Sequence, residues 1–328
     1  MARPRIYVSR AVQPSVLAQL GEVGVVRAWE GQDRCPADVL EKEVAGVDAV
    51  LGTYRWTAAL MDKAARLRLI ALTSVGYDMV DVEAATARDI LVTNTPDVLT
   101  DTVADLTFAL MLSAGRRICE MDRWLRAGQW KDAAGAPMAW DIHHATLGII
   151  GLGRIGSAVA RIALAFNMKV LYCDTERKTA LEQQYGYRYA DMSTVLRESD
   201  FVSLHVPLLP GTTRLMGAAQ LAQMKRTAFL INTSRGSVVD EAALIKALQE
   251  KRIAGAGLDV FEKEPVDLAN PLLKMENVVV LPHVGSATDA TRTAMLDLSV
   301  KNVLAVLQGK PPLTPVNPEV VSRWENKP

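Results

Sequence analysis

Short apolar runs rich in β-branched residues alternate along the sequence with longer segments of helical period. The clearest runs lie from residue 146 onward, at 146–150, 169–173, 201–206, 228–233, 255–260 and 277–281. A strand that is apolar along its whole length is typical of a parallel sheet covered by helices on both faces. The pattern therefore predicts an α/β fold built from βαβ units.

The first hundred residues carry a second, weaker series of the same kind. We expect strands at 5–9, 25–29, 49–54, 69–74 and 91–94, and helices at 36–44 and 57–65. A long helix at 101–127, for which Asp101 is a plausible cap, should separate the two series, followed by a loop at 128–144. A helix at 290–307 precedes a short tail and is expected to pack back on the first domain. Because 328 residues exceed one ordinary domain, we expect two.

The charges of the chain are balanced, with 37 Lys and Arg residues against 37 Asp and Glu residues. This balance argues against nucleic acid or membrane surfaces as partners. The cysteines Cys35, Cys119 and Cys173 are far apart and lack metal-ligand spacing, which fits a reducing compartment and predicts no metal site. Because no signal peptide and no run of roughly 18 apolar residues is present, we expect a soluble, cytoplasmic protein.

A glycine-rich turn follows the apolar run 146–150 directly. Its residues Gly151, Gly153 and Gly156 match the pattern G-x-G-x-x-G and open a helical segment. In such a unit the first glycine permits a tight turn, the second lets a pyrophosphate approach, and the third lets helix pack on strand. Amides at the helix N-terminus favour phosphate groups. The context predicts a dinucleotide site, against the alternative that these glycines only tighten a turn.

The next strand ends in Asp174, 18 residues beyond Gly156. An acidic side chain at this position accepts hydrogen bonds from the adenosine ribose and repels a 2′-phosphate. The residue therefore favours NAD(H) over NADP(H). Arg177 and Lys178 follow closely and could partly reverse the choice, so NADP(H) stays possible.

Three ionisable residues leave consecutive strands at the edge where open parallel sheets bind ligands. They are Arg235, Glu264 and His283, after the fourth, fifth and sixth strands of the second series. Arginine can bind the carboxylate of a 2-oxo acid and polarise its carbonyl, histidine can deliver a proton, and a carboxylate can hold the second ring nitrogen. This combination predicts a catalytic group for hydride transfer. Taken singly, the three could be a surface ion pair, a solvated loop charge and a structural histidine.

The remaining histidines are weaker candidates for chemistry. His205 ends a strand in the segment H-V-P-L, and we expect it to line the adenine pocket with Pro207. His143 and His144 lie in the loop near Trp140, where a structural or interfacial role is expected.

The turn at residues 74–78 follows a strand of the first series. Backbone amides around Val75 and Gly76 could bind a carboxylate in the manner of a nest. A plain turn without any ligand accounts for these residues equally well.

With these residues in place, the chain resembles the D-isomer-specific 2-hydroxyacid dehydrogenase family over essentially its whole length. Within that family it is most similar to glyoxylate/hydroxypyruvate reductases and 2-ketogluconate reductases. The resemblance rests on the segments S-V-G-Y-D (74–78), T-P-D-V-L-T-D-T-V-A-D (95–105), L-G-I-I-G-L-G-R-I-G (147–156), N-T-S-R-G-S-V-V-D-E (232–241), A-G-L-D-V-F-E-K-E-P (256–265) and P-H-V-G-S-A-T (282–288).

The resemblance implies the roles already given to the three catalytic candidates and assigns the substrate carboxylate to the amides of Val75 and Gly76. It also implies cofactor contacts from Thr102, Arg154, Ile155, Thr233, Asp259 and Gly285, beside those of the glycine turn and Asp174. It implies two Rossmann-like or flavodoxin-like domains with parallel sheets and a cleft between them. The substrate domain would comprise 1–100 and 289–328, and the dinucleotide domain 101–288. The expected assembly is a homodimer in which loop 140–144 reaches the partner.

The activity implied is the NAD(P)H-dependent reduction of glyoxylate, hydroxypyruvate or 2-ketogluconate to the D-2-hydroxy acid, with loop 52–56 deciding among them. Many NADPH-using reductases of this subgroup carry a small or basic residue where Asp174 stands. A short 3-phosphoglycerate or D-lactate type dehydrogenase is an alternative, for which Arg55 and Arg292 are candidate phosphate ligands. An NAD-sensing corepressor-like binding protein of the same fold is a further alternative.

Overall fold

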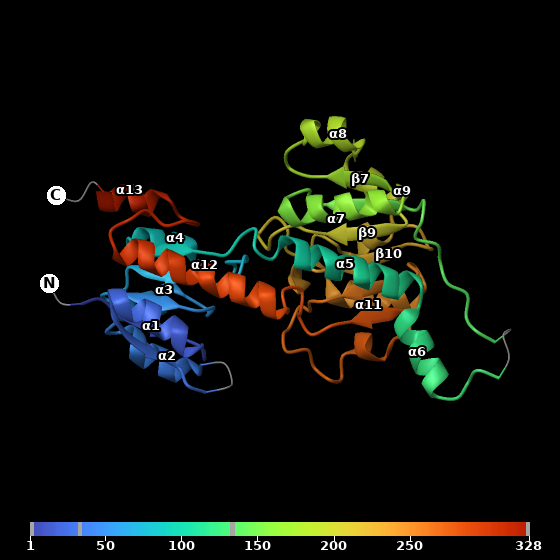
Figure 1. The fold of residues 1–328 in the computed structure, drawn as a ribbon. Helices are drawn as coiled ribbons and strands as arrows, with labels where there is room; N and C mark the ends of the chain where they lie inside the picture. Colours follow the sequence, from blue (N-terminus) through green and yellow to red (C-terminus); the bar gives the residue numbers. More distant parts are fainter. Residues whose placement is uncertain (1–2, 32–34, 132–134, 326–328) are drawn as a thin grey trace. The chain divides into compact units, whose positions relative to one another are not determined.

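Two parallel β-sheets organise the chain in the computed structural model, which describes residues 3–31, 35–131 and 135–325. Unit 1 comprises Met1–Leu99 and Thr288–Pro328, and unit 2 comprises Thr100–Ala287. Each unit contains one of the sheets together with the helices that cover it (Figure 1). Within the described residues, no helix combines the length and the apolar character needed to cross a membrane. The α/β architecture expected from the sequence is confirmed.

The sheet of unit 1 has the strand order β2-β1-β3-β4-β5, and all its pairs are parallel. Its strands are β1 (Arg5–Val8), β2 (Val25–Ala28), β3 (Ala49–Leu51), β4 (Leu69–Ala71) and β5 (Leu91–Thr93). Its helices are α1 (Pro14–Val23), α2 (Ala37–Val44), α3 (Ala58–Lys63), α4 (Val82–Ala87), α12 (Asp289–Leu307) and α13 (Glu319–Glu325). The register places Ile6 between Val26 and Ala49.

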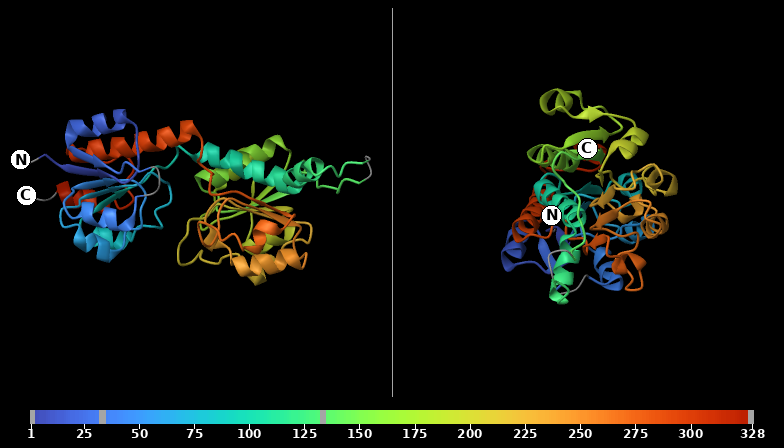
Figure 2. Two further views of the ribbon diagram at one scale, coloured as in Figure 1. Left: turned by 90° about the horizontal axis from the view of Figure 1, so that it is seen from below. Right: turned by 90° about the vertical axis from the view of Figure 1, so that its right-hand side faces the viewer.

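Helix α12 returns the chain to unit 1 from the far end of the sequence. It begins after Thr288, whose side chain accepts a hydrogen bond from Thr291 N, and it lies beside α1 over one face of the sheet (Figure 2). Its residues Val300 and Val303 are buried in the same core cluster as Leu51. Burial of this apolar face explains why a helix so distant in sequence belongs to the first sheet.

The sheet of unit 2 has the strand order β12-β11-β10-β9-β6-β7-β8, again with parallel pairs. Its strands are β6 (Thr146–Ile150), β7 (Lys169–Cys173), β8 (Arg188–Tyr189), β9 (Phe201–Leu204), β10 (Phe229–Asn232), β11 (Gly255–Leu258) and β12 (Val278–Val280). Strand β6 lies between β7 and β9, so the order reverses beside it. Open parallel sheets bind ligands beyond the carboxyl ends of the strands at such a switch point.

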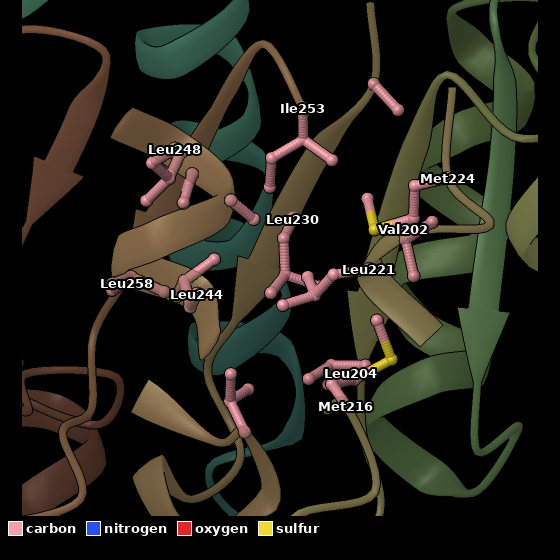
Figure 3. Close-up of a cluster of buried hydrophobic side chains, with 14 of the residues drawn as sticks. Val202, Leu204, Met216, Leu221, Met224, Leu230, Leu244, Leu248, Ile253 and Leu258 are labelled. Carbon is pink, nitrogen blue, oxygen red and sulfur yellow. The ribbon is translucent and has the colours of Figure 1, made fainter. Parts of the chain in front are cut away.

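Helices cover both faces of the unit 2 sheet (Figure 2). They are α5 (Thr100–Gly115), α7 (Arg154–Ala165), α8 (Thr179–Tyr185), α9 (Met192–Glu198), α10 (Ala218–Leu221) and α11 (Glu241–Gln249). Helices α5 and α7 pack together, and Phe108 and Val159 share a core cluster with Ile149. Figure 3 shows the second cluster, in which Leu221 of α10 and Leu244 of α11 join the strand residues. This double cover matches the continuously apolar strands.

The prediction of a single helix at 101–127 is wrong. The segment contains α5 and a separate helix α6 (Ile118–Arg126), because Arg117 between them adopts a left-handed backbone with φ 55°. Residues other than glycine seldom adopt this conformation, so the sequence pattern does not reveal the break. Helix α5 packs on the sheet, whereas none of the residues of α6 is buried. Asp101 lies in the first turn of α5 rather than before it.

Several short elements escaped the sequence analysis. Among them are α1, α4, the edge strand β8, and α13 in the short tail. Some expected strands are also shorter, for example 49–54, of which only Ala49–Leu51 is paired. The residues that follow leave the sheet and form the loops at its carboxyl edge.

Candidate active site

The glycine turn between β6 and α7 has the geometry that a dinucleotide needs. Gly151 has a φ of +94°, and a Cβ at Gly156 would lie 2.2 Å from Gly151 O. A side chain is therefore strained at the first position and excluded at the third. A Cβ at Gly153 would meet nothing within 4 Å, so the backbone there is open to an approaching group. Each of the three positions therefore favours glycine for a different physical reason.

Helix α7 starts at the end of this turn, with Gly153 at its N-cap in extended conformation. Arg154 and Ile155 form the first turn of the helix, where backbone N–H groups lack intrahelical acceptors. These amides and the positive end of the helix dipole suit a pyrophosphate. The residues present therefore fit a dinucleotide.

Asp174 follows β7 and is tied to the glycine turn. Its Oδ2 accepts a hydrogen bond of 2.7 Å from Leu152 N, and its Oδ1 accepts hydrogen bonds from Thr175 Oγ1 and Glu176 N. The carboxylate is half-buried beside the turn. This is the position from which an acidic side chain reaches an adenosine ribose.

His205 follows β9 and holds its ring against the sheet. Its Nε2 lies 2.8 Å from Ser203 Oγ, and its backbone N donates to Ile150 O. Desolvation by burial lowers the pKa of His205 to about 3, so the ring is neutral at neutral pH. Such a ring can pack against an aromatic group but is no general acid at neutral pH. Pro207 is exposed two residues on, and its carbonyl accepts a hydrogen bond from Thr212 Oγ1.

Arg235 is held by the loop that follows β10. The buried side chain of Asn232, 1% exposed, donates to Arg235 O at 2.9 Å and accepts from Ser234 N and Ser234 Oγ. A Cβ at Gly236 would lie 1.8 Å from the carbonyl carbon of Phe261, so the loop is pressed against the next one. The half-buried Arg235 also donates from Nη1 to Ser234 O. The arginine therefore projects from a closely packed loop.

Glu264 and His283 form a direct pair, with 2.7 Å between Glu264 Oε2 and His283 Nδ1. The other carboxylate oxygen of Glu264 accepts from Phe261 N at 3.1 Å. Burial alone raises the pKa of Glu264, but hydrogen bonds from His283 and Phe261 N and the charges of His283 and Arg235 outweigh it and leave the pKa below its ordinary value. An ionised carboxylate only accepts hydrogen bonds, so Nδ1 must be the donor. Nε2 of His283 is then the nitrogen that can exchange a proton with a substrate.

Asp259 holds the loop that carries His283. Its carboxylate is 1% exposed and accepts from Val284 N and Gly285 N, both at 2.8 Å, while His283 N donates to Asp259 O. Burial raises the pKa of Asp259, and the two amide bonds only partly offset this. His283 itself has a φ of 56°. Asp259 and Gly285, expected at the cofactor, are therefore also bonded to each other.

Thr102 and Thr233, two of the expected cofactor contacts, both lie in unit 2. Thr102 is half-buried in the first turn of α5. Thr233 follows β10, and its hydroxyl lies 2.9 Å from Thr107 Oγ1 of α5. Thr107 in turn donates to Val103 O, so the end of β10 is linked to this helix.

The turn around Val75 and Gly76 belongs to unit 1 and follows β4. Ser74 Oγ donates to Gly76 O and Asn94 Nδ2 donates to Val75 O, both at 2.8 Å. Within the described part of the chain, neither the Val75 amide nor the Gly76 amide donates a hydrogen bond. The two carbonyls therefore accept hydrogen bonds within the protein, while the two amides remain able to donate.

His143 and His144 lie elsewhere on unit 2. Their ring centroids are 5.3 Å apart, and they line a pocket of about 250 Å³ with Trp140, Asp200 and Phe229. Asp200 directly precedes β9 and Phe229 opens β10, so the pocket lies at the amino edge of the sheet. The glycine turn lies at the opposite edge. Across the described residues, no group of three or more His, Cys, Asp or Glu is arranged to hold a metal ion.

The sequence analysis missed Asn232 and Asn94 as organisers of the loops that carry Arg235 and Val75. A signal for Asn232 exists, because an amide at the end of an otherwise apolar strand must find hydrogen-bond partners when it is buried. For Asn94 the sequence offers no comparable signal, since its partner Val75 lies in another loop.

Comparison with known proteins adds to this geometry. Residues 108–285 match the family model described as the D-isomer specific 2-hydroxyacid dehydrogenase, NAD binding domain. The chain is 46% identical to a glyoxylate reductase of Korarchaeum cryptofilum, over 97% of both chains. It is 44% identical to a glyoxylate reductase of Thermococcus litoralis, over 98% of both chains.

Solved structures agree with these relatives. The NADPH-dependent glyoxylate/hydroxypyruvate reductase of Sinorhizobium meliloti, solved with NADP and malonate, is 39% identical with a TM-score of 0.86, covering 96% of this chain and 97% of its own. A glyoxylate reductase from Paecilomyes thermophila is 28% identical with a TM-score of 0.88, covering 97% and 100%. The chain therefore belongs to the D-isomer-specific 2-hydroxyacid dehydrogenase family of nicotinamide-dependent oxidoreductases.

Proposed function

We propose that this protein is a reductase of glyoxylate and closely related small 2-oxo acids, such as hydroxypyruvate and 2-ketogluconate, which it converts to the D-2-hydroxy acid. The observation that carries the proposal is the 2.7 Å pair of Glu264 and His283, at the same sheet edge as the glycine turn. The names of the relatives support glyoxylate as the first substrate to test.

The catalytic roles follow from the local geometry. When bound, the reduced nicotinamide supplies a hydride to the carbonyl carbon. His283 gives its Nε2 proton to the carbonyl oxygen as negative charge develops there. Glu264 holds Nδ1–H and stabilises the imidazolium, as in other pairs of histidine and carboxylate. Arg235 binds the substrate carboxylate with its planar fork of donors and polarises the carbonyl.

The substrate carboxylate is also assigned to the amides of Val75 and Gly76. Their carbonyls are held by Ser74 and Asn94, and successive amides in a turn form an anion-binding nest. Such a nest binds a single carboxylate, which suits a small 2-oxo acid.

We propose NADH as the preferred cofactor. The support is Asp174, which Leu152 N holds at 2.7 Å beside the glycine turn and which would repel a 2′-phosphate. The contacts proposed for the dinucleotide are Thr102, Gly151, Gly153, Arg154, Ile155, Gly156, Asp174, His205, Pro207, Thr233, Asp259 and Gly285.

We also propose a homodimer. Helix α6 and the loop after it expose large apolar side chains, namely Ile118, Leu125, Trp130 and Met138, the last of which is 86% exposed. Several large apolar side chains exposed within one segment suit a surface that a partner covers. Light scattering of the purified protein tests this assembly, and a monomer would contradict it. The cytoplasmic location stays a prediction.

The decisive experiment follows the absorbance of the reduced nicotinamide while glyoxylate, hydroxypyruvate, 2-ketogluconate, 3-phosphohydroxypyruvate or pyruvate is added with NADH or NADPH. We expect oxidation with glyoxylate or hydroxypyruvate and faster turnover with NADH. Faster turnover of the phosphorylated acid would overturn the substrate assignment. Binding of the cofactor without any oxidation would point instead to the NAD-sensing role.

A further inference from the structure

An arginine close in sequence to the proposed ribose residue is bound to another partner. Arg177 follows Asp174 by three residues, and an arginine near this position of a dinucleotide fold is the group that accommodates a 2′-phosphate. Here its Nε donates to Glu182 Oε1 at 2.9 Å and its Nη2 donates to Glu182 Oε2 at 2.7 Å. The Nε and Nη2 nitrogens of the guanidinium therefore donate within the protein.

Glu182 is itself firmly held in α8. Tyr172 Oη donates to Glu182 Oε1 at 2.7 Å and accepts from Lys178 N at the same distance. Tyr172 is fully buried, and the side chain of Glu182 is only 15% exposed. Hydrogen bonds from Arg177 and Tyr172 lower the pKa of Glu182 to about 2. The carboxylate therefore stays charged wherever the protein is folded and active.

A ring contact fixes the arginine from a second direction. The guanidinium carbon of Arg177 lies 5.6 Å from the centroid of Tyr189, whose ring packs edge-on against Tyr172. Exposed ion pairs usually contribute little, because two flexible side chains must be ordered. Here the two-point fork binds a carboxylate that the buried Tyr172 already holds, and the cation–π contact orders the guanidinium further, so much of that freedom is removed beforehand.

The neighbouring cation is less constrained. Lys178 Nζ lies 2.5 Å from Glu176 Oε2, but the side chain of Glu176 is 78% exposed and makes a single contact with the lysine. This pair can open at small cost. The difference singles out Arg177 as the cation whose availability depends on one residue.

We propose that Glu182 is a specificity-determining residue that excludes NADP(H) by keeping Arg177 away from the position of the 2′-phosphate. The inference rests on the proposed ribose site at Asp174. Asp174 disfavours the 2′-phosphate by its charge, and Glu182 binds Arg177 through two hydrogen bonds. Loss of Glu182 should then release Arg177 toward the phosphate.

Calorimetric titration of the full chain with NADP⁺ and with NAD⁺ tests this proposal without depending on turnover. In Glu182→Ala we expect NADP⁺ to bind about tenfold more tightly, the effect of roughly one charged hydrogen bond, with little change for NAD⁺. Glu182→Gln keeps the size and the acceptor for Tyr172 and should shift NADP⁺ binding in the same direction by less. Glu198→Gln is the matched control, because it weakens the pair with Arg188 in the same unit.

A double-mutant cycle identifies the cation. Arg177→Ala should change NADP⁺ binding little in the natural background but remove the whole gain in the Glu182→Ala background. Equal effects of Arg177→Ala in both backgrounds would overturn the proposal. So would a ratio of the dissociation constants for NADP⁺ and NAD⁺ that stays unchanged in both Glu182 variants. If the natural protein already binds NADP⁺ as tightly as NAD⁺, the cofactor proposal itself fails, which is a separate outcome.

Discussion

At the carboxyl edge of the unit 2 sheet, the loops present ionisable side chains, among them Arg235, Glu264 and His283. At the same edge of the unit 1 sheet, the hydrogen bonds around the Val75 turn come from a hydroxyl and a carboxamide. Both sheets follow the same rule for where ligands bind, yet their edges are built from different chemistry.

The difference reflects two kinds of task. Moving a proton requires a group that can change its charge, and this group needs a fixed partner such as Glu264. Binding a carboxylate requires only donors, which backbone amides supply once their carbonyls are tied back. We therefore expect large effects at the unit 2 edge, on kcat when the proton donor is lost and on KM when the arginine is changed. At the unit 1 edge we expect a modest weakening of substrate binding.

The largest effect is expected for His283→Ala. Loss of the proposed general acid should lower kcat by about 100-fold or more, because the developing alkoxide no longer receives the imidazole proton. Stopped-flow or steady-state turnover measures the loss, and calorimetric binding of NADH, which should persist, is the control. Turnover near that of the natural protein would falsify the assignment.

The next effect is expected for Arg235→Lys. An ammonium cannot reproduce the two-point fork, so KM for the 2-oxo acid should rise by about 10–100-fold, the effect of one charged hydrogen bond. Arg214→Lys is the matched control, since Arg214 forms an exposed pair with Glu262. An unchanged KM in Arg235→Lys, or an equal rise in the control, would remove Arg235 from the substrate site.

A smaller effect is expected at the edge of unit 1. Asn94→Ala removes a neutral hydrogen bond to Val75 O and should raise KM by about 2–10-fold with little change in kcat. Asn317→Ala serves as the control, because Asn317 is a buried clamp in the same unit that accepts from Val92 N and donates to Ile90 O. That variant should lose thermal stability without a change in KM. A large fall in kcat for Asn94→Ala would break the proposed division of labour.

The smallest effect concerns acid stability at the edge of unit 2. Burial lowers the pKa of His205 from 6.5 to about 3, so between these values the unfolded chain binds a proton that the folded chain does not. Stability contributed by the neutral ring is therefore present above pH 6.5 and lost as the pH falls. The drop in Tm from pH 7 to pH 5 should be smaller in His205→Gln by about 2–4 °C.

His143→Gln is the control for this measurement, because the exposed imidazole stays in water in both states. The same pH dependence of Tm in His205→Gln and in the natural protein would show that the buried ring is not the group responsible.

Much of this arrangement could be predicted from local sequence patterns. The uninterrupted apolar runs indicated parallel sheets covered on both faces, because a polar side chain in such a strand would be buried without partners. The glycine turn could be located because its three positions have strict steric requirements. Arg235, Glu264 and His283 could be nominated because parallel strands bring their carboxyl ends to one edge.

Other features depended on contacts between residues that are distant in sequence. The break at Arg117 occurs where α5 leaves the core, and the loop of Arg235 is shaped by Gly236 against Phe261. Asp259 also depends on such distant contacts, because its carboxylate accepts hydrogen bonds from amides 25 and 26 residues away. Periodicity and spacing report which face of an element is buried. Hydrogen-bond partners and the direction of a charged side chain are decided only when the packed chain brings those groups within bonding distance.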